Sequence, residues 1–210
     1  MISTRLIPLA AIILCAGCNP GYCSANLDLA GSPDGPGAYP GAPYGSDVGS
    51  TIANLSIAGT QRDDNKNGTP SDDPLRTITL DDYRVDPGLR VLVILVAAEW
   101  CLPCQNEQKE LVAEYQAYRN EKAGVAMLEA ITQKANSSPA DAETIANWAT
   151  HYNVPFDMTF DPGAVLAPYS DPSTYPAQLV IRTSDMNIRW THNGYEPGSL
   201  KDAIDSVLAK

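Results

Sequence analysis

The chain has 210 residues, of which 44% are hydrophobic, and it carries a formal net charge of −11 at pH 7. This length suffices for one domain with a full hydrophobic core and an appended segment. The negative charge argues against a nucleic-acid partner, because few cationic side chains are present to neutralise phosphates. Five cysteines, at positions 15, 18, 23, 101 and 104, are too few and too unevenly placed for a disulfide scaffold. We expect a monomer.

Residues 1–17 have the pattern of a signal peptide. A single Arg in MISTR precedes the apolar run LIPLAAIILCA, whose eleven residues are too few to span a bilayer as a helix. The following LCAGC resembles the lipobox of bacterial lipoproteins, although Cys15 stands where Leu is commonest. The resemblance implies cleavage before Cys18, lipid attachment to Cys18, and a location in the bacterial periplasm or on the cell surface. The alternative is an ordinary secretory signal and a free soluble protein.

Residues 18–50 are dominated by Gly, Pro, Ser and Ala. Such a composition buries too little apolar surface to offset the entropy of ordering, so it predicts a flexible tether between a lipid anchor and a domain at 51–210. Cys23 lies in this tether. We interpret it as a bystander thiol, with an interchain disulfide as the alternative.

Two short alternating stretches, 51–57 and 75–80, predict strands. The loop 63–73 between them has the spacing of a calcium loop at four positions, namely Asp63, Asn65, Asn67 and Gly68. However, Pro74 occupies the twelfth position, where a bidentate Glu is needed. The pattern therefore favours a solvated acidic loop over a calcium site.

The apolar run 90–100 reads as a strand buried on both faces of a sheet, and so does the run 124–132. Between them, residues 105–122 carry apolar side chains at helical spacing. Strands that alternate with helices in this way predict an α/β sandwich of three layers.

A second helix is predicted over 137–153, with Ser138 as its N-cap, Pro139 as its first residue and Asp141 as the capping-box acid. The stretches 177–182 and 187–192 predict two strands joined by a turn, followed by a last helix over 198–209 that Ser199 caps.

Cys101 and Cys104 are separated by two residues in AEWCLPCQNE. As a structural crosslink they would close a very small ring and remove little chain entropy. As a zinc site they supply only two ligands, and no second CxxC or nearby His pair completes a tetrahedron. We therefore expect no metal at this pair.

As a redox pair the two cysteines are well placed, because Cys101 lies where a buried strand ends and a helix begins. Unpaired N–H groups and the helix dipole favour a thiolate there. Pro103 suits the first helical turn. We predict that Cys101 is the exposed nucleophile, and that Cys104, one turn deeper, resolves the mixed disulfide.

The segment WCLPCQNE resembles the active site of thioredoxin-like proteins, and more narrowly that of the membrane-anchored TlpA/ResA group of thiol–disulfide oxidoreductases. The segment TYPAQLVI is similar to the loop whose cis-proline faces the CxxC pair in this family. The resemblance covers roughly residues 48–208. It implies a thioredoxin-like three-layer fold, with a central mixed β-sheet flanked by helices, and no cofactor besides the Cys101–Cys104 disulfide.

The resemblance also implies roles for single residues. Glu107 matches the Glu found three residues after the second cysteine, and it would exchange a proton with Cys104; the alternative is a surface carboxylate paired with Lys109 or Arg119. Pro176 would be the cis-proline, leaving the Tyr175 backbone free to pair with an extended substrate. We expect substrate contacts from the residues around these groups: Trp100, Leu102, Pro103 and Tyr175.

The implied partners are protein thiols and disulfides, apocytochrome c among them, and a membrane electron donor. One competing interpretation is an inactive adhesion or scaffold domain that keeps the fold. Two other functions also compete. A peroxiredoxin shares the fold but has a Thr three residues before a single peroxidatic Cys, and here that position is Ala98. A copper-delivery protein of this fold usually has cysteines three residues apart and a downstream His, for which His192 is the one plausible candidate. The CxxC spacing favours disulfide exchange over both.

Overall fold

The computed structural model describes residues 37–61, 73–171 and 173–210. The signal peptide, Cys18, Cys23 and nearly all of the loop 63–73 lie outside the described residues. Within them, one mixed sheet has the order β2-β1-β5-β4-β3-β6-β7. Its strands are β1 (Ser56–Thr60), β2 (Arg76–Thr79), β3 (Val91–Ala97), β4 (Val125–Ile131), β5 (Asp157–Phe160), β6 (Ala177–Arg182) and β7 (Asn187–Asn193). The helices are α1 (Leu80–Arg84), α2 (Leu102–Glu121), α3 (Ala142–Tyr152), the 3₁₀ turn η2 (Ala167–Tyr169) and α4 (Ser199–Leu208).

Strands β3 and β4 form the parallel centre of the sheet, and every residue of both is buried. Successive side chains of β3 enter opposite faces, so that Val93 and Leu95 join one hydrophobic cluster while Leu92 and Ile94 join the other. This arrangement confirms the prediction of strands buried on both faces, and it explains their continuous apolar runs.

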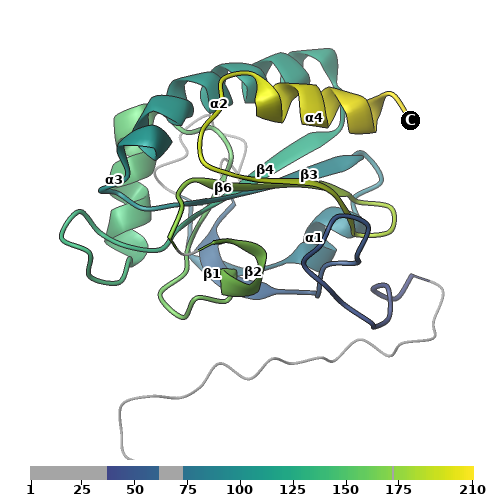
Figure 1. The fold of residues 1–210 in the computed structure, drawn as a ribbon, viewed down its shortest axis with the longest axis horizontal. Helices are drawn as coiled ribbons and strands as arrows, with labels where there is room; N and C mark the ends of the chain where they lie inside the picture. The colour runs from purple at the N-terminus through teal and green to yellow at the C-terminus, as the bar shows by residue number, and fades with distance from the viewer. Residues whose placement is uncertain (1–36, 62–72, 172) are drawn as a thin grey trace, which may run out of the picture.

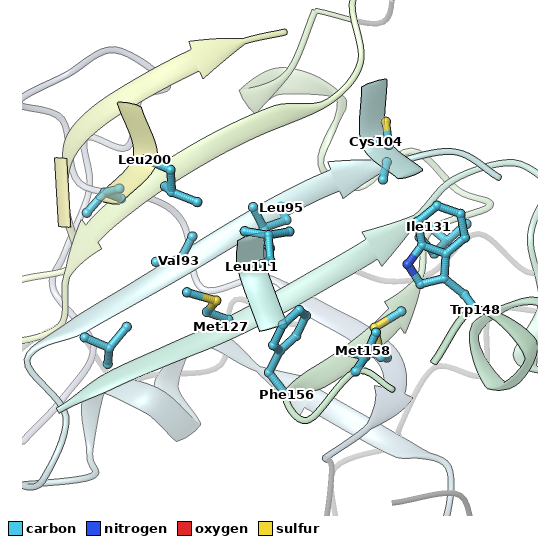
Figure 2. Packing of buried hydrophobic residues seen from close by; sticks show 14 of the residues in the cluster. Val93, Leu95, Cys104, Leu111, Met127, Ile131, Trp148, Phe156, Met158 and Leu200 are labelled. Atoms are coloured by element: carbon cyan, nitrogen blue, oxygen red, sulfur yellow. The ribbon is translucent and has the colours of Figure 1, made fainter. Parts of the chain in front are cut away.

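The sheet lies between two covering layers (Figure 1). Helices α2, α3 and α4 contribute their apolar side chains to one face. Figure 2 shows Leu111 of α2 next to Leu95 of β3, with Trp148 of α3 beside Ile131. The other face is covered by α1 and by irregular chain from the N-terminal side. The prediction of a three-layer α/β sandwich is confirmed. None of the helices in the described ranges is long and apolar enough to span a bilayer.

The described part of the segment predicted as a tether is packed against the domain. Tyr39 is buried, and its hydroxyl donates to the Ile52 carbonyl oxygen at 3.0 Å. The Gly49 N–H donates to the Ile188 carbonyl oxygen at 2.8 Å, next to the bridge between Thr51 and Asn187. The packed chain therefore begins upstream of the predicted start at Thr51, because tyrosines supply apolar surface that the Gly/Pro composition conceals.

Helix boundaries differ from the predictions at two N-caps. Helix α3 begins at Ala142 with Asp141 as its N-cap, and Ser138 lies in the preceding loop. The Asp141 carboxylate accepts the Thr144 N–H at 3.0 Å, which satisfies a donor that Ser138 is too far back to reach. Helix α4 has Gly198 as its N-cap, while Ser199 is the first helical residue.

Helix α2 begins at Leu102, in agreement with the prediction that a helix starts at Cys101 and has Pro103 in its first turn. Two further differences concern short elements. Leu80 starts helix α1 rather than ending a strand, and β5 (Asp157–Phe160) was not predicted, because neither element has enough residues to show a periodicity.

Candidate active site

Cys101 and Cys104 form a disulfide at the N-terminus of α2, with their Cα atoms 5.3 Å apart. Cys101 is the N-cap residue, and its Sγ accepts the Cys104 N–H at 3.1 Å. Pro103 lies in the first turn, where its missing N–H has no intrahelical partner to lose. The Cys104 N–H and the helix dipole thus both act on the sulfur of Cys101, as the strand–helix junction predicts.

The prediction that Cys101 is an exposed thiol is wrong for the disulfide form. Its side chain is 2% exposed, against 0% for Cys104, because the sulfur turns inward toward Cys104 and the helix N-terminus. The neighbouring side chains are the exposed ones: Trp100 at 46% and Leu102 at 63%. A partner that approaches the disulfide therefore meets these residues first.

The segment before β6 lies at the same end of the sheet as the disulfide. Ala177 pairs with Val96 near the end of β3, which places Pro176 beside the chain that leads to Cys101. The Tyr175–Pro176 peptide bond is cis, as the resemblance to the cis-proline loop implies. The ring of Tyr175 packs edge-on against Trp100, with 5.7 Å between centroids.

Thr132 connects the end of β3 to the segment before β6 by hydrogen bonds. Its hydroxyl donates to the Ala97 carbonyl oxygen and shares a hydrogen bond with the Tyr175 hydroxyl, each at 3.0 Å. Trp100 is held in turn, because its indole N–H donates to Gln133 Oε1 at 2.8 Å. The predicted contact residues Trp100 and Tyr175 therefore form one aromatic edge beside the disulfide.

A cleft of about 280 Å³ adjoins this aromatic edge, and neither cysteine of the disulfide lines it. Its walls include Trp100, Thr132, Gln133, Pro162, Ala167 and Tyr175. Aromatic and apolar walls with a few hydroxyl and amide groups suit a side chain of a polypeptide.

Glu107 is buried one turn beyond Cys104, so it is not the surface carboxylate of the alternative interpretation. Gln178 on β6 donates an amide N–H to Glu107 Oε1. Burial raises the pKa of Glu107 to about 8, with smaller contributions from the Glu110 and Glu114 carboxylates, while the Gln178 hydrogen bond lowers it. Glu107 can therefore hold or release a proton near neutral pH.

A second buried carboxyl group, Glu129 on β4, was not identified from the sequence. It is 1% exposed and accepts an amide N–H from Gln108 of α2. Burial raises its pKa to about 8, and repulsion from Glu107 adds to the effect. The sequence signal was available: Glu129 is the one charged residue in the buried run 124–132.

The outer face of α2 near Glu107 is acidic. Burial, followed by repulsion from Glu110, raises the pKa of Glu114 to about 7. A hydrogen bond to Glu110 raises the pKa of Tyr195 to about 12. Glu107 and Gln178 line a narrow pocket at this surface together with Glu110, Glu114 and Tyr195.

Metal ligands do not gather in the described ranges: no group of three or more His, Cys, Asp or Glu side chains there is arranged to hold an ion. His192 lies on β7, opposite Gln178, and its ring stacks on Trp190.

Residues 63–190, more than half of the sequence, match the profile of the AhpC/TSA family. The chain belongs to the AhpC/TSA family. It is therefore a thioredoxin-fold protein of the family that includes thiol–disulfide oxidoreductases and peroxiredoxins. A search of curated protein sequences gives no significant match.

Several solved structures share the fold of this chain. A candidate thiol:disulfide interchange protein DsbE from Chlorobium tepidum is 20% identical, with a TM-score of 0.53 over 77% of this chain and 98% of its own. A candidate protein disulfide isomerase from Bacteroides thetaiotaomicron is 17% identical, with a TM-score of 0.58 over 78% and 91%. The reduced 2-Cys peroxiredoxin of Plasmodium vivax is 11% identical, with a TM-score of 0.56 over 77% and 82%. At these identities the likeness confirms the thioredoxin-like fold.

Proposed function

We propose that this protein is an extracytoplasmic thiol–disulfide oxidoreductase of the TlpA/ResA group that exchanges disulfides with polypeptides through Cys101 and Cys104. The observation that carries the proposal is the disulfide at the N-terminus of α2, beside the Tyr175–Pro176 segment and the aromatic edge. A lipid on Cys18 would hold the domain at a membrane, within reach of a membrane electron donor and of protein partners such as apocytochrome c.

The exchange runs in two displacements. A thiolate of a reduced donor attacks the Cys101 sulfur, the Cys101–Cys104 bond breaks, and Cys104 leaves as a thiolate that takes a proton from Glu107. The second thiolate of the donor then attacks its own mixed disulfide and releases Cys101 as a thiolate. Two electrons pass from the donor, which becomes a disulfide, to the cysteine pair. Reduction of a substrate disulfide is the reverse sequence, with Glu107 accepting the proton of Cys104.

The contact residues have separable roles in this proposal. Trp100, Leu102 and Pro103 surround Cys101 at the surface, so a polypeptide partner would lie against them. Tyr175 would contribute its backbone to an extended substrate strand, and the cleft beyond Trp100 would take a side chain of that strand.

Insulin-disulfide reduction tests the proposal. We expect Cys101→Ser to abolish the activity, and Cys104→Ser to trap a mixed disulfide on Cys101 that gel electrophoresis without reductant detects. Wild-type rates in both variants would refute catalysis by this pair. The redox potential of the pair then decides the direction of electron flow: a value near that of thioredoxin means a reductase, and one near that of strong thiol oxidants means disulfide formation.

Peroxidase chemistry is the competing outcome, because the AhpC/TSA family and its fold relatives include a peroxiredoxin. Ala98, where a peroxiredoxin has Thr, leaves no hydroxyl to position a peroxide, and Cys101 is already bonded to a partner three residues away. Peroxide consumption that survives Cys104→Ser and outpaces insulin reduction would replace the oxidoreductase proposal with this one.

A further inference from the structure

A cluster of buried polar side chains lies between α2 and the sheet, one turn of helix from Cys104. Its members come from four elements: Glu107 and Gln108 of α2, Glu129 of β4, Trp148 of α3 and Gln178 of β6. All are at most 4% exposed. In the sheet, Leu95 pairs with Glu129 on one side and with Gln178 on the other, so these two polar residues share a cross-strand row on the face that α2 covers.

The cluster contains two pairs, each of one carboxyl group and one carboxamide. Gln178 donates an N–H to Glu107 Oε1, and Gln108 donates an N–H to Glu129 Oε1. In both pairs the amide oxygen of the glutamine is buried and has no hydrogen-bond partner among the described residues.

This pattern fits protonated carboxyl groups. A carboxylate only accepts hydrogen bonds, so it cannot satisfy an amide oxygen, whereas a carboxylic acid accepts the amide N–H and has an O–H to donate. Glu129 Oε2 is likewise buried without a partner in the described chain. The indole N–H of Trp148 is close enough to lower the pKa of Glu129, yet it forms no hydrogen bond there. Burial raises the pKa of both acids to about 8, against the hydrogen bonds that each acid accepts, which lower it.

We propose that Glu129 is a positioning residue for the dithiol reaction: with Glu107 it forms a coupled pair of buried acids, of which Glu107 exchanges the proton with Cys104. This inference deepens the proposed function and rests on it. Because two buried charges at close range repel each other, the loss of one proton makes the loss of the second harder.

The coupling matters because Cys104 leaves as a buried thiolate when the disulfide opens. Glu107 is one turn away and supplies the proton, so it must still be protonated at the working pH. At a pH high enough to ionise one of the two acids, its charge makes the other harder to ionise, so the pair keeps one proton where an isolated acid would have lost it. In the opposite direction, a neutral Glu129 allows Glu107 to accept the proton of Cys104.

Other groups also face the pair and enter its titration. On α2 they are Glu110 and Glu114, which raise the pKa of Glu107. Before α4, a hydrogen bond to Glu110 raises the pKa of the Tyr195 hydroxyl, and the charge of Glu107 raises it further. On α3, the charge of Glu129 raises the pKa of Tyr152. From β6 and β3 the facing residues are Gln178 and Leu95, which carry no charge.

The test is a pH titration of the glutamate side-chain ¹³C carboxyl signals in the oxidised full-length domain, assigned with Glu107→Gln and Glu129→Gln. We expect the Glu107 and Glu129 signals of the wild type to report neutral acids at pH 7 and to titrate in two coupled steps. In Glu129→Gln we expect one step for Glu107, with a midpoint lower by about one pH unit. A wild-type Glu129 signal that reports a carboxylate at pH 7 would overturn the proposal without any variant.

A functional readout accompanies the spectra. The rate at which dithiothreitol reduces the Cys101–Cys104 disulfide is measured against pH, and we expect its upper pH limit to fall in Glu129→Gln by the same amount as the Glu107 midpoint. Glu121→Gln, an exposed change on the same helix, is the matched control and leaves the profile in place. An unchanged profile in Glu129→Gln refutes the inference alone, because the insulin assays of the cysteine variants test the oxidoreductase function separately.

Discussion

Replacement of Glu107 by Gln tests whether the buried acid is neutral in the folded domain. Burial raises the pKa of Glu107 from 4.5 to about 8. A carboxyl group whose pKa is higher in the folded than in the unfolded state binds its proton more tightly when folded. Its stabilising contribution is therefore complete below pH 4.5 and is lost as the pH rises toward 8. At about 1.4 kcal/mol per pKa unit, the loss is on the order of 5 kcal/mol.

Glutamine at this position reproduces the protonated acid and does not titrate. Its amide can accept the Gln178 N–H and donate to the Gln178 oxygen, so the fold and the packing are retained. The free energy of unfolding of Glu107→Gln, relative to that of the wild type, should therefore rise by about 3 kcal/mol between pH 5.5 and pH 7.5, two pH units at the rate above.

Urea unfolding of the oxidised protein, followed by tryptophan fluorescence at several pH values, measures this difference. Taking the difference between variant and wild type removes most contributions from other titrating groups. Glu121→Gln changes an exposed charge on the same helix and should give a flat difference. A difference for Glu107→Gln that is also flat would mean that Glu107 is ionised in the folded domain, and the reasoning about its burial would fail.

Three further changes test other parts of the structure. Tyr39→Ala should lower the free energy of unfolding by about 3 kcal/mol, because it removes a buried ring and its hydrogen bond to Ile52; a loss below about 1 kcal/mol in urea unfolding would show that this segment does not belong to the packed domain. Asp141→Ala should cost about 1 kcal/mol by removing the N-cap of α3, while Ser138→Ala should cost less than half of that, and the reverse order would restore Ser138 as the cap. Trp100→Ala should lower kcat/KM for insulin reduction about tenfold, with reduction by dithiothreitol changed less than twofold. Equal losses with both substrates would assign Trp100 to the stability of the site rather than to substrate contact.

Local patterns predicted the parts of the fold whose signals lie within a few residues of one another. The apolar runs that became β3 and β4 record burial on both faces of a sheet, and the Cys101–Cys104 spacing together with Pro103 marks the N-terminus of α2. The Tyr175–Pro176 segment, predicted from its resemblance to the cis-proline loop, lies at the same end of the sheet as the disulfide. These features follow from residue type and short-range spacing, which can be read from the sequence without knowledge of the tertiary contacts.

Only the tertiary structure showed what the polar residues of the core contact. Glu107 meets Gln178 across 71 positions of sequence, and Gln108 meets Glu129 across 21. No periodicity reports such distances, because they depend on how α2 lies over the row of β6, β3 and β4. The inward orientation of the Cys101 sulfur likewise depends on the position of Cys104 in the folded chain. Sequence alone therefore determined the cysteine pair and its sheet, whereas the packing of distant segments decided the buried surroundings that raise the pKa of Glu107 and Glu129.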